Sequence, residues 1–590
     1  MTLPELGKSG STCPVAYFSM EVGLESGMAT YSGGLGVLAG DTLRAAADMS
    51  LPMIGVTLLN RKGYFRQMLN AEGNQLERPD VWDPAKYLEP LGTKIYVEIE
   101  ERRVYVRPWR YILTGISGHQ VPVFFLDTAL PENSPWDQTL TDYLYGGDDH
   151  YRLCQEIILG MGGVQVLRAL DYRDIKAYHM NEGHSALLIL SLMEEEQARR
   201  NLPAVNNVCA EGVKDVCVFT THTPVPAASD KFPMELVTRV LGEKHSTNLT
   251  NASCFKEEVL NMTYLGLCFS RYINGVSQRH EEISRSMFPN YPINSITNGV
   301  HAVTWTSPRL AQLYDKHIPE WRRDNLYLRY SVSIPIEEIQ DAHSRAKQDL
   351  IAEVARRSGV HLDSNFLTLG FARRATGYKR ANLLFSDIER LREIVRSAGP
   401  LQIIFGGKAH PKDLSGKAII NTIFQAAKEL KDEIRVVYLE EYDIELAKYL
   451  ISGSDLWLNT PQKPEEASGT SGMKAALNGV PSLSILDGWW IEGHVEGVTG
   501  WSIGEGWELE SNPSKEITSL YNKLEHVILP MFYSRPAAFA WVMRNAIALN
   551  GSYYNAQRML FQYIQNAYYP PSNTENPGIL FEANQNGAAK

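Results

Sequence analysis

The chain has 590 residues and a formal net charge of -11, and this length exceeds a single compact core and predicts two large domains. Its hydrophobic fraction of 44% and charged fraction of 21% are those of an ordinary globular protein. The acidic balance argues against non-specific nucleic-acid binding, and no apolar run is long enough to span a membrane. Because the first residues lack a basic start and an apolar core, no secretion signal is expected and the cytoplasm is the expected location.

Short buried strands are predicted in both halves of the chain. In chain order they are Val15 to Ser19, Lys176 to Met180, Val216 to Thr221, Phe366 to Phe371, Leu401 to Phe405, Ile434 to Leu439, Leu456 to Leu458 and Ser482 to Leu486. Helical patterns alternate with them, which predicts parallel sheets with helices on both faces. We therefore expect an α/β protein in which two Rossmann-like domains face each other across a cleft, with ligands at the carboxyl ends of the strands.

The domain boundary is predicted near the middle of the chain. The charged helical stretch from Ile336 to Arg357 is interpreted as a connector that enters the second unit. The two domains are predicted to comprise residues 1–302 and 303–590, the second ending in a C-terminal helix. The tail after Pro570, rich in Asn, Pro and Gly, is expected to be loose.

The six cysteines all lie in the first half of the chain. They form no CxxC pair, and their spacing is not typical of zinc ligands, so no metal site is predicted. Because the chain is large and has no secretion signal, reduced thiols are expected rather than disulfides.

A glycine-rich turn, Tyr31-Ser32-Gly33-Gly34-Leu35-Gly36, occurs early in the chain. Glycines there permit a close approach of the backbone to an anion or a sugar. A lone glycine cluster is more often only a tight turn, so this motif by itself carries little weight.

Two histidines follow consecutive predicted strands of the first half. Asn181-Glu182-Gly183-His184 ends one strand, and Thr221-His222-Thr223-Pro224 ends the next. A lone histidine is most often a satisfied structural residue. Here both are expected on the same side of one sheet, where a ligand site would lie.

A cluster of cations follows the predicted strand Phe366 to Phe371. The segment Arg373-Arg374-Ala375-Thr376-Gly377-Tyr378-Lys379-Arg380 holds four cations within eight residues. A solvated charged loop is the commoner explanation for such a run. Its place at the carboxyl end of a buried strand favours a role in the cleft, where arginine suits a two-point grip on an anion and lysine a movable charge.

The most informative segment is Glu466-Ala467-Ser468-Gly469-Thr470-Ser471-Gly472-Met473-Lys474, between a buried strand and a short helical run. Small residues at a strand-to-helix turn leave backbone N–H groups and a helix dipole free to hold an anion. Lys474 then lies one turn into the helix. An anion site beside a lysine amine is the layout that covalently bound pyridoxal phosphate requires.

These motifs together resemble the α-glucan phosphorylases, the family that includes glycogen, starch and maltodextrin phosphorylase. The string EASGTSGMKAALNG is similar to the family's cofactor-lysine motif, and the resemblance continues in the same order from Tyr17 to about Tyr563. It implies a GT-B-type architecture and a short, bacterial-type member. It also implies the cofactor pyridoxal 5′-phosphate, held by Lys474, Arg373, Tyr378, Thr470 and Ser471.

The resemblance further implies three catalytic residues, Arg374, Lys379 and His222, and a set of substrate contacts. Arg374 and Lys379 should hold inorganic phosphate, and His222 should face the reacting glucose with its backbone carbonyl and reach the sugar with its side chain. The other implied substrate contacts are Gly33, Gly34, Leu35, His184, Asn298, Glu466, Ala467, Ser468 and Gly469.

The implied reaction is phosphorolysis of α-1,4-linked glucose from the non-reducing end of a glucan, giving glucose 1-phosphate with retention. In the family, the 5′-phosphate of pyridoxal acts as the proton donor and acceptor. Neither nucleic acid nor a membrane is expected as a partner, and a homodimer is the assembly that we consider.

Two departures from longer family members lead to further expectations. This chain has Tyr442-Asp443 where many members carry Tyr-Arg, which removes one cation near the cofactor phosphate. Little sequence precedes Tyr17, so control by AMP or by phosphoserine is not expected.

Two alternatives of other classes stay open at this point. A glucan synthase that uses a nucleotide sugar would share the architecture, the early Gly-Gly-Leu loop and a basic patch, but would not need a lysine in the small-residue turn. A non-catalytic glucan-binding relative should have lost Lys474, Arg374 or Lys379, and all of these are present.

Overall fold

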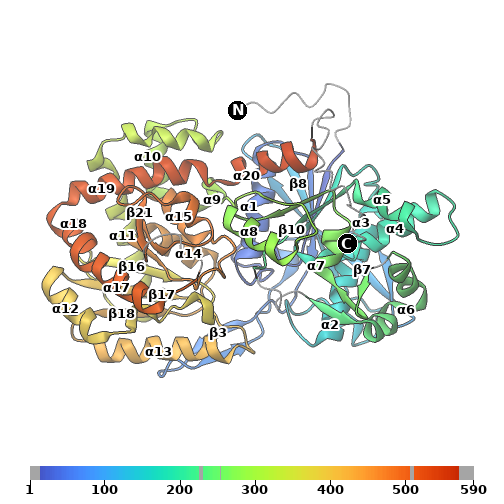
Figure 1. Cartoon of the computed structure of the whole chain (residues 1–590), viewed down its shortest axis with the longest axis horizontal. Coiled ribbons are helices and arrows are strands. Elements are labelled where there is room, and N and C mark those ends of the chain that lie inside the picture. Colours follow the sequence, from blue (N-terminus) through green and yellow to red (C-terminus); the bar gives the residue numbers. More distant parts are fainter. Residues whose placement is uncertain (1–12, 225–229, 253, 505–509, 571–590) are drawn as a thin grey trace, which may run out of the picture.

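The computed structural model describes residues 13–224, 230–252, 254–504 and 510–570. Within them the chain forms a mixed α/β fold with two large sheets, one built mainly by each half of the chain (Figure 1). This confirms the predicted α/β class and its parallel sheets. The tail after Pro570, predicted to be loose, lies outside the described residues.

The first sheet is parallel except at one edge. Its strands follow the spatial order β15, β14, β10, β9, β1, β2, β8, β7 and β5, with β6 paired to β7, and the pairs from β15 to β8 are parallel. Their bounds are β1 Val15–Ser19, β2 Met53–Leu58, β5 Glu89–Pro90, β6 Ile95–Ile99, β7 Arg102–Thr114, β8 Gln120–Asp127, β9 Ala177–Asn181, β10 Cys217–Thr220, β14 Tyr272–Gly275 and β15 Ile293–Ser295.

The second sheet is parallel throughout, in the order β18, β17, β16, β19, β20 and β21. Its strands are β16 Leu367–Ala372, β17 Leu401–Gly406, β18 Arg435–Leu439, β19 Leu456–Asn459, β20 Ser482–Ile485 and β21 Gly500–Ile503. Two small antiparallel sheets pair β3 Arg66–Leu69 with β4 Gln75–Arg78, and β11 Lys231–Pro233 and β12 Phe255–Lys256 with β13 Val259–Asn261.

Helices cover both sheets. Their bounds are α1 Gly34–Asp48, α2 Asp149–Ile157, α3 Gly163–Ala169, α4 Leu188–Arg199, α5 Asn207–Lys214, α6 Met234–Asn251, α7 Met262–Cys268, α8 Gln278–Met287, α9 Ala302–Trp305, α10 Pro308–His317, α11 Ile336–Ser358, α12 Ile388–Ala398, α13 Leu414–Leu430, α14 Ile444–Gly453, α15 Ser471–Leu477, α16 Trp490–Gly493, α17 Pro513–Lys523, α18 Leu529–Ser534, α19 Pro536–Asn545 and α20 Ala556–Tyr563.

Strand β1 explains why the first sheet is buried on both faces. Val15 and Tyr17 belong to the hydrophobic core that contains α1 and α20, whereas Ala16 and Phe18 belong to the core that contains α3 and α4. Alternate side chains of a strand point to opposite faces, so a continuous apolar run requires cover on both. Helices therefore lie on the two faces of this sheet, as the sequence predicted.

The predicted strands match the observed ones closely. Strand β1 has the predicted bounds, the other predicted strands differ from the observed ones by one residue at one or both ends, and α11 extends one residue beyond the expected connector helix. The antiparallel strands β7 and β8 were not predicted. Strand β7 alternates exposed and buried residues over much of its length, a half-buried pattern that differs from the parallel strands.

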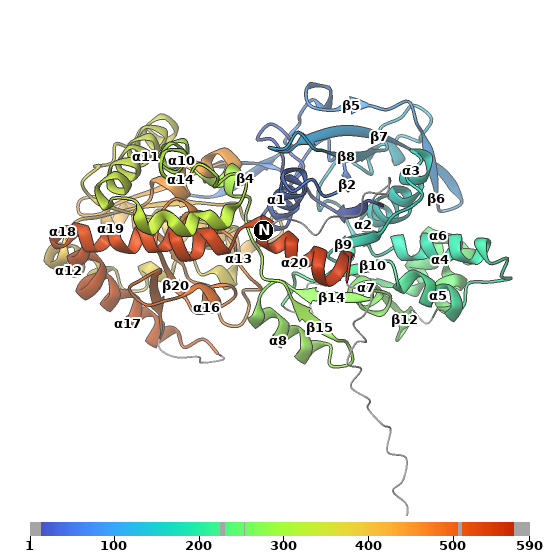
Figure 2. The ribbon, with the colours of Figure 1, turned by 90° about the horizontal axis from the view of Figure 1, so that it is seen from above.

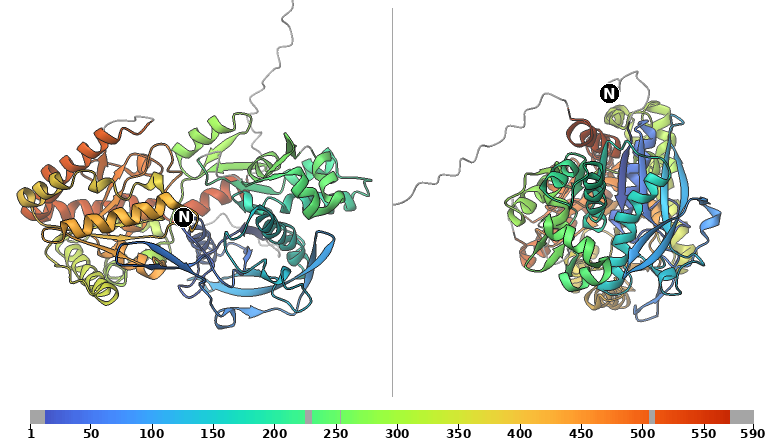
Figure 3. Two further views of the ribbon diagram at one scale, coloured as in Figure 1. Left: turned by 90° about the horizontal axis from the view of Figure 1, so that it is seen from below. Right: turned by 90° about the vertical axis from the view of Figure 1, so that its right-hand side faces the viewer.

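The hairpin of β3 and β4 joins the first half of the chain to the second. In Figure 3 it extends from the first sheet toward α13. The Gln67 side chain donates to the carbonyl of Gly407 at 2.9 Å, and Gln75 exchanges hydrogen bonds with the backbone of Ala409 at 2.8 and 2.9 Å. Because Gln67 and Gln75 are buried, these bonds satisfy groups that water cannot reach.

The C-terminal helix makes a second connection, in the opposite direction. The run from α19 to α20 passes from the second sheet to the first, where Met559 and Leu560 join the core beneath β1 (Figure 2). Tyr568 Oη lies 2.6 Å from His179 Nδ1, and His179 Nε2 lies 2.8 Å from Thr220 Oγ1. A buried polar network thus fixes Tyr568, shortly after α20, on the first sheet.

In the part of the chain that the structure describes, every helix is too short or too polar to serve as a membrane span. All six cysteines are free thiols, and four of them are buried.

Candidate functional site

A cavity of about 1020 Å³ is lined by loops of both sheets. Segments that follow β1, β9 and β10 contribute from the first sheet, and segments that follow β16, β18 and β19 contribute from the second. Every site residue nominated from the sequence lines this cavity: Gly33, Gly34, Leu35, His184, His222, Asn298, Arg373, Arg374, Tyr378, Lys379, Glu466, Ala467, Ser468, Gly469, Thr470, Ser471 and Lys474. These residues are far apart in the sequence but meet here, because the carboxyl ends of parallel strands lie along one edge of a sheet.

Glu21 shapes the glycine loop. One of its carboxylate oxygens accepts from the backbone N–H groups of Ser32, at 2.5 Å, and Gly33, at 3.3 Å. Its other oxygen accepts from the Tyr145 hydroxyl at 2.9 Å. A Cβ added at Gly33 or Gly34 would meet no atom within 4 Å, so these glycines face open space at the start of α1. The loop is therefore held from behind and leaves its backbone open to the cavity.

Lys474 presents a buried amine to the cavity. Its side chain is 8% exposed, and its Nζ lies 3.9 Å from the centre of the Trp305 ring. The Nζ amine has no hydrogen-bond or ion-pair partner among the described residues. Burial lowers the pKa of Lys474 to about 8, against the opposing attraction of Asp41. A sizeable neutral fraction near physiological pH is what a nucleophilic lysine needs.

Two of the predicted phosphate-binding cations share one carboxylate. Glu466 Oε2 accepts from Arg373 Nη2 at 2.6 Å and from Lys379 Nζ at 2.5 Å. Although burial favours the neutral acid, Arg373 and Lys379 hold the pKa of Glu466 at about 2. The carboxylate is therefore charged at neutral pH, and it fixes both cations at the cavity wall.

Arg374 is different, because its guanidinium has no hydrogen-bond or ion-pair partner among the described residues. It projects into the cavity, where solvent reaches it, and Tyr64, Tyr145 and Tyr378 surround it. Burial disfavours its charge, but Tyr378, Tyr64 and Glu21 raise the pKa of Arg374 overall. An unpaired guanidinium in a cavity is suited to bind an anion through two N–H groups.

His222 is a neutral side chain with a fixed orientation. Its Nε2 donates to Asn181 Oδ1 at 2.6 Å, and its backbone N–H donates to Glu182 Oε2 at 2.7 Å. Burial, with a smaller contribution from nearby histidines, lowers the pKa of His222 to about 3. The ring is thus uncharged at neutral pH and suited to hydrogen bonding rather than to acid catalysis.

Glu182, between the two histidine loops, has a strained backbone. Its φ of 76° lies in the left-handed region, which glutamate rarely adopts. Its carboxylate accepts from the N–H of Gly183 at 3.1 Å and from the Thr223 hydroxyl at 3.0 Å. Strain of this kind persists where surrounding bonds impose it, and here it ties the loop after β9 to the loop after β10.

Two polar atoms of the predicted sugar contacts have no partner in the described structure. They are Oδ1 of Asn298 and Nδ1 of His184, and both belong to residues that line the cavity. The other ring nitrogen of His184 lies 3.4 Å from Asp230, and Asp230 also pairs with Arg152 at 3.0 Å. Unsatisfied buried polar atoms are uncommon, and such atoms beside a cavity are suited to bind hydroxyl groups.

The start of α15 offers backbone N–H groups rather than side-chain hydroxyls. Thr470 is the N-cap residue, and its side chain makes no capping bond. The Ser471 hydroxyl accepts from Trp457 Nε1 at 3.0 Å and lies 3.4 Å from Asn459 Oδ1. The Ser471 side chain is thus occupied, and an anion held here would bind mainly to N–H groups of the first turn.

Asp443, which the sequence analysis expected near the cofactor phosphate, also lines the cavity. It is the N-cap of α14, where its Oδ1 accepts from the N–H of Leu446 at 2.7 Å. The carboxylate therefore has a structural partner. Its local role is to begin a helix, which is what an aspartate at this position does well.

Several cavity residues were not nominated from the sequence. They are Glu21, Tyr64, Tyr145, Trp305, Arg152, Asp230 and Asp443 among others. Asn181 and Glu182 lie within a string that the sequence had singled out, so that string contained their signal. Glu21 and Trp305 belong to no local pattern, because their partners are distant in sequence.

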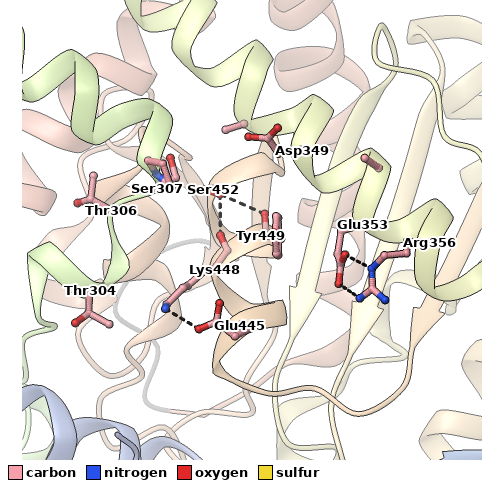
Figure 4. A pocket seen from close by; sticks show the side chains of 13 residues that line it. Thr304, Thr306, Ser307, Asp349, Glu353, Arg356, Glu445, Lys448, Tyr449 and Ser452 are labelled. Carbon is pink, nitrogen blue, oxygen red and sulfur yellow. Dashed lines mark hydrogen bonds and ion pairs between the residues drawn. The ribbon is translucent and has the colours of Figure 1, made fainter. Parts of the chain in front are cut away.

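A second hollow, of about 590 Å³, lies at α11 and α14 and contains none of the nominated residues (Figure 4). Its charged side chains pair within the protein: Glu353 with Arg356 at 2.6 Å, and Glu445 with Lys448 at 2.8 Å. The larger cavity is therefore the candidate active site, since it brings the unpaired cation, the buried amine and the open polar atoms together.

Comparisons with known proteins identify the family of this chain. A family model described as carbohydrate phosphorylase matches residues 242–499. Maltodextrin phosphorylase of Thermococcus litoralis is 37% identical, over 94% of this chain and 70% of that protein. Glycogen phosphorylases of Aquifex aeolicus and Mycobacterium tuberculosis are each 35% identical, over 94% and 96% of this chain and 86% and 72% of their own lengths. These matches show that the chain belongs to the carbohydrate phosphorylase family.

Proposed function

We propose that this protein is an α-glucan phosphorylase, which converts an α-1,4-glucan and inorganic phosphate into α-glucose 1-phosphate. The observation that carries the proposal is that Arg374 and Lys474 line the same cavity. The first is a guanidinium with no partner among the described residues, and the second is a buried amine. An anion and a carbonyl group are the ligands that such groups bind. The relatives named maltodextrin and glycogen phosphorylase support the glucan as substrate.

The residues present also fit pyridoxal phosphate as the cofactor. Lys474 would hold its carbonyl carbon, and the start of α15 with Thr470 and Ser471 would hold its phosphate. Arg373 and Tyr378 complete the set, since both line the cavity beside this helix. When bound, this group would supply a phosphate whose second pKa near neutrality suits it to exchange protons.

The roles of the protein's own groups in the reaction follow from their charges. Arg374 and Lys379 would hold substrate phosphate near the glycosidic bond. The bond between C1 and the glycosidic oxygen breaks, that oxygen takes a proton from substrate phosphate, and a phosphate oxygen then bonds to C1 on the same face. Glu466 stays charged beside Lys379 and orients it. Closure of the surrounding loops would exclude water, which favours phosphorolysis over hydrolysis.

The glucose would lie against the first sheet. The open backbone at Gly33 and Gly34, with Leu35, would contact the sugar and the phosphate. Asn298 and His184 offer free polar atoms for hydroxyl groups, and His222 is held in place by Asn181. On the other side, Ala467, Ser468 and Gly469 follow Glu466 along the cavity wall and would complete the sugar site.

For the architecture we propose two Rossmann-like domains of the GT-B type, residues 1–302 and 303–590, facing across the cavity. Two separate parallel sheets, both contributing loops to one cavity, support this division. The packing of α20 against the first sheet means that the last helix would belong in space with the first domain. Six free cysteines are compatible with a reducing compartment, and we propose the cytoplasm.

The reaction can be tested by incubating the full-length protein with maltodextrin and phosphate. Phosphorus NMR should detect glucose 1-phosphate, and its coupling constant should identify the α anomer. A reaction that proceeds only with UDP-glucose or ADP-glucose would favour a synthase, and glucan binding without turnover would favour a non-catalytic relative. Borohydride reduction and peptide mapping should find the cofactor on Lys474, and a label on another lysine would overturn that assignment.

A further inference from the structure

The Lys474 amine rests on the face of an indole ring that is itself anchored. Trp305, at the end of α9, is 2% exposed, and the Lys474 Nζ lies 3.9 Å from its ring centre. At that distance the negative face of the ring attracts an ammonium group. Both side chains line the large cavity, so the contact occurs at the candidate active site rather than in the core.

Asp41 holds the ring from behind. The Trp305 Nε1 donates to both carboxylate oxygens of Asp41, at 3.0 and 2.8 Å, and Asp41 is 1% exposed. Its nearest cation is Arg44, one turn along α1, at 3.8 Å. When a carboxylate accepts a hydrogen bond from an indole N–H, the ring becomes more electron-rich. The Asp41 carboxylate therefore strengthens the attraction of the ring for an ammonium group. The charge of Asp41 also acts on Lys474 directly.

Asn478 locks the two helices that carry the pair. Its Nδ2 donates to the carbonyl of Trp305 at 2.8 Å and to the carbonyl of Lys474 at 2.9 Å. Its Oδ1 accepts from the N–H of Ser307 at 2.7 Å. These buried bonds therefore fix the backbones of Trp305 and Lys474 relative to each other.

A second buried lysine shows what is unusual about this arrangement. Lys347 is 4% exposed, and its Nζ donates directly to Asp455 at 2.6 Å and to the carbonyl of Phe366 at 2.7 Å. A direct carboxylate contact stabilises the ammonium form and leaves the amine unreactive. At Lys474 the Asp41 carboxylate binds the edge of the Trp305 indole instead of the amine itself. The amine is therefore positioned without a hydrogen bond from its nitrogen to any described residue.

We propose that Asp41 and Trp305 are positioning residues for Lys474, which hold its amine at one point of the cavity, where it can meet a bound carbonyl group. The proposal deepens the function proposed above, because that function requires this amine to bind a cofactor aldehyde. In that capture the lysine nitrogen replaces the aldehyde oxygen, and one water leaves. A buried tryptophan usually serves only to fill the hydrophobic core. The amine on its face and the carboxylate on its edge distinguish this one.

The other charged groups near the amine leave Asp41 as its main electrostatic partner. Helix α15 contains no other charged residue, and α9 contributes only the Trp305 ring. On α14, Asp443 opens to the same cavity but caps its own helix, and Glu445 pairs with Lys448. On the wall opposite, Arg373 pairs with Glu466. Removing the charge of Asp41 should therefore change the proton affinity of Lys474 more than removing any of these.

The test measures the reactivity of the amine itself, on full-length protein from which any cofactor has been removed. Acetic anhydride is applied across a pH series, and mass spectrometry gives the acetylation rate of Lys474, with the exposed Lys428 as an internal standard and the buried, paired Lys347 as an unreactive reference. For Asp41→Asn we expect the midpoint of the Lys474 profile to fall by about half a unit or more. For Trp305→Leu we expect a lower midpoint and at least a tenfold slower capture of pyridoxal phosphate, with Trp305→Phe intermediate.

Matched controls come from a similar pair elsewhere in the chain. Trp321 is also fully buried, and its Nε1 donates to Asp315 at 2.7 Å, away from the cavity. Trp321→Phe and Asp315→Asn should leave the Lys474 profile unchanged. If Asp41→Asn and Trp305→Leu lower only the melting temperature and leave the midpoint in place, the pair is structural and the proposal is wrong. If the midpoints move but wild-type protein captures no pyridoxal phosphate, the positioning role stands and the proposed function fails.

Discussion

The Glu466 carboxylate lies 2.5 Å from the Lys379 amine, and the same oxygen accepts from Arg373. Two of the cations that the sequence assigned to phosphates therefore share one buried acid, which offsets one of their two charges, while Arg374 has no partner among the described residues. This difference separates a cation that is built into the wall from one that is available to a ligand. It leads to different expectations for substitutions of Glu466 and of Arg374.

Glu466→Gln should destabilise the protein in a pH-dependent way. Removing one member of a buried ion pair costs about 3–5 kcal/mol, because the partner charges lose their compensation. Arg373 and Lys379 hold the pKa of Glu466 at about 2, below the 4.5 of an ordinary glutamate. The stability from this carboxylate is thus fully present above pH 4.5 and is lost as the pH falls through about 2. Thermal unfolding of both proteins should show a gap in melting temperature at pH 6 that narrows below pH 4.5, and a constant gap would contradict the ion pair.

Arg374→Ala should weaken the binding of substrate phosphate while leaving the cofactor in place. The lost charge-assisted contact is worth about 1.5–3 kcal/mol in the ground state, and more where charge develops in the transition state. Arg374→Lys should recover little, because a point charge does not reproduce a two-point grip. Steady-state kinetics with varied phosphate, alongside the absorbance of the bound cofactor, would measure both effects. Loss of the cofactor with normal phosphate affinity would mean that the two anion sites are assigned the wrong way round.

Lys474→Met should stabilise the cofactor-free protein. Burial lowers the pKa of Lys474 to about 8 from 10.5, so folding penalises the charged amine by on the order of 3 kcal/mol. The penalty is complete below pH 8 and disappears as the pH rises through 8 toward 10.5, where the unfolded chain also loses the proton. The variant should therefore melt at a higher temperature at pH 7, and the difference should shrink by pH 10. A variant that is less stable at pH 7 would show that the contacts of the amine with Trp305 and Asp41 outweigh the cost of its burial.

Asn181→Leu should release His222 while keeping a side chain of similar branched shape. The substitution removes the oxygen that accepts from His222 Nε2 at 2.6 Å. The freed ring would lose its fixed orientation, and the ordering that the hydrogen bond supplies is worth about 1 kcal/mol or more. Catalytic efficiency with glucan should fall roughly tenfold or more while the cofactor content stays at the wild-type level. An unchanged efficiency would indicate that the His222 side chain does not need this partner.

Gln67→Ala should weaken the connection between the hairpin and the second sheet. Gln67 is buried, and its removal leaves the carbonyl of Gly407 without this donor, at a cost of about 1–3 kcal/mol. Asn421→Ala is the matched control, because Asn421 donates to the carbonyl of Glu72 at 2.6 Å from an exposed position on the same interface. Denaturant unfolding should show a larger loss for Gln67→Ala than for the control. Equal losses would mean that burial does not decide the strength of this contact.

The sequence by itself determined eight of the buried strands, the turns that follow several of them and many of the residues that line the cavity. Continuous apolar runs such as Val15–Ser19 and Leu401–Gly406 require cover on both faces, and the turns that follow parallel strands must meet at one edge. These are local properties, because burial and turn geometry are encoded in neighbouring residues. The nominated residues of the glycine loop, the cation cluster and the lysine turn therefore gather in one place.

Only the tertiary structure decided which of those residues are paired and which are free. Glu466 is bound to Arg373 and Lys379, whereas Arg374 has no partner among the described residues, a division that differs from the roles that the sequence assigned to them. Asp41 reaches Lys474 through Trp305 because α1, α9 and α15 meet at one point, which no periodicity within any of them reveals. The physical reason is that side-chain pairing depends on distances between segments far apart in the chain, and those distances are set by sheet order and helix packing.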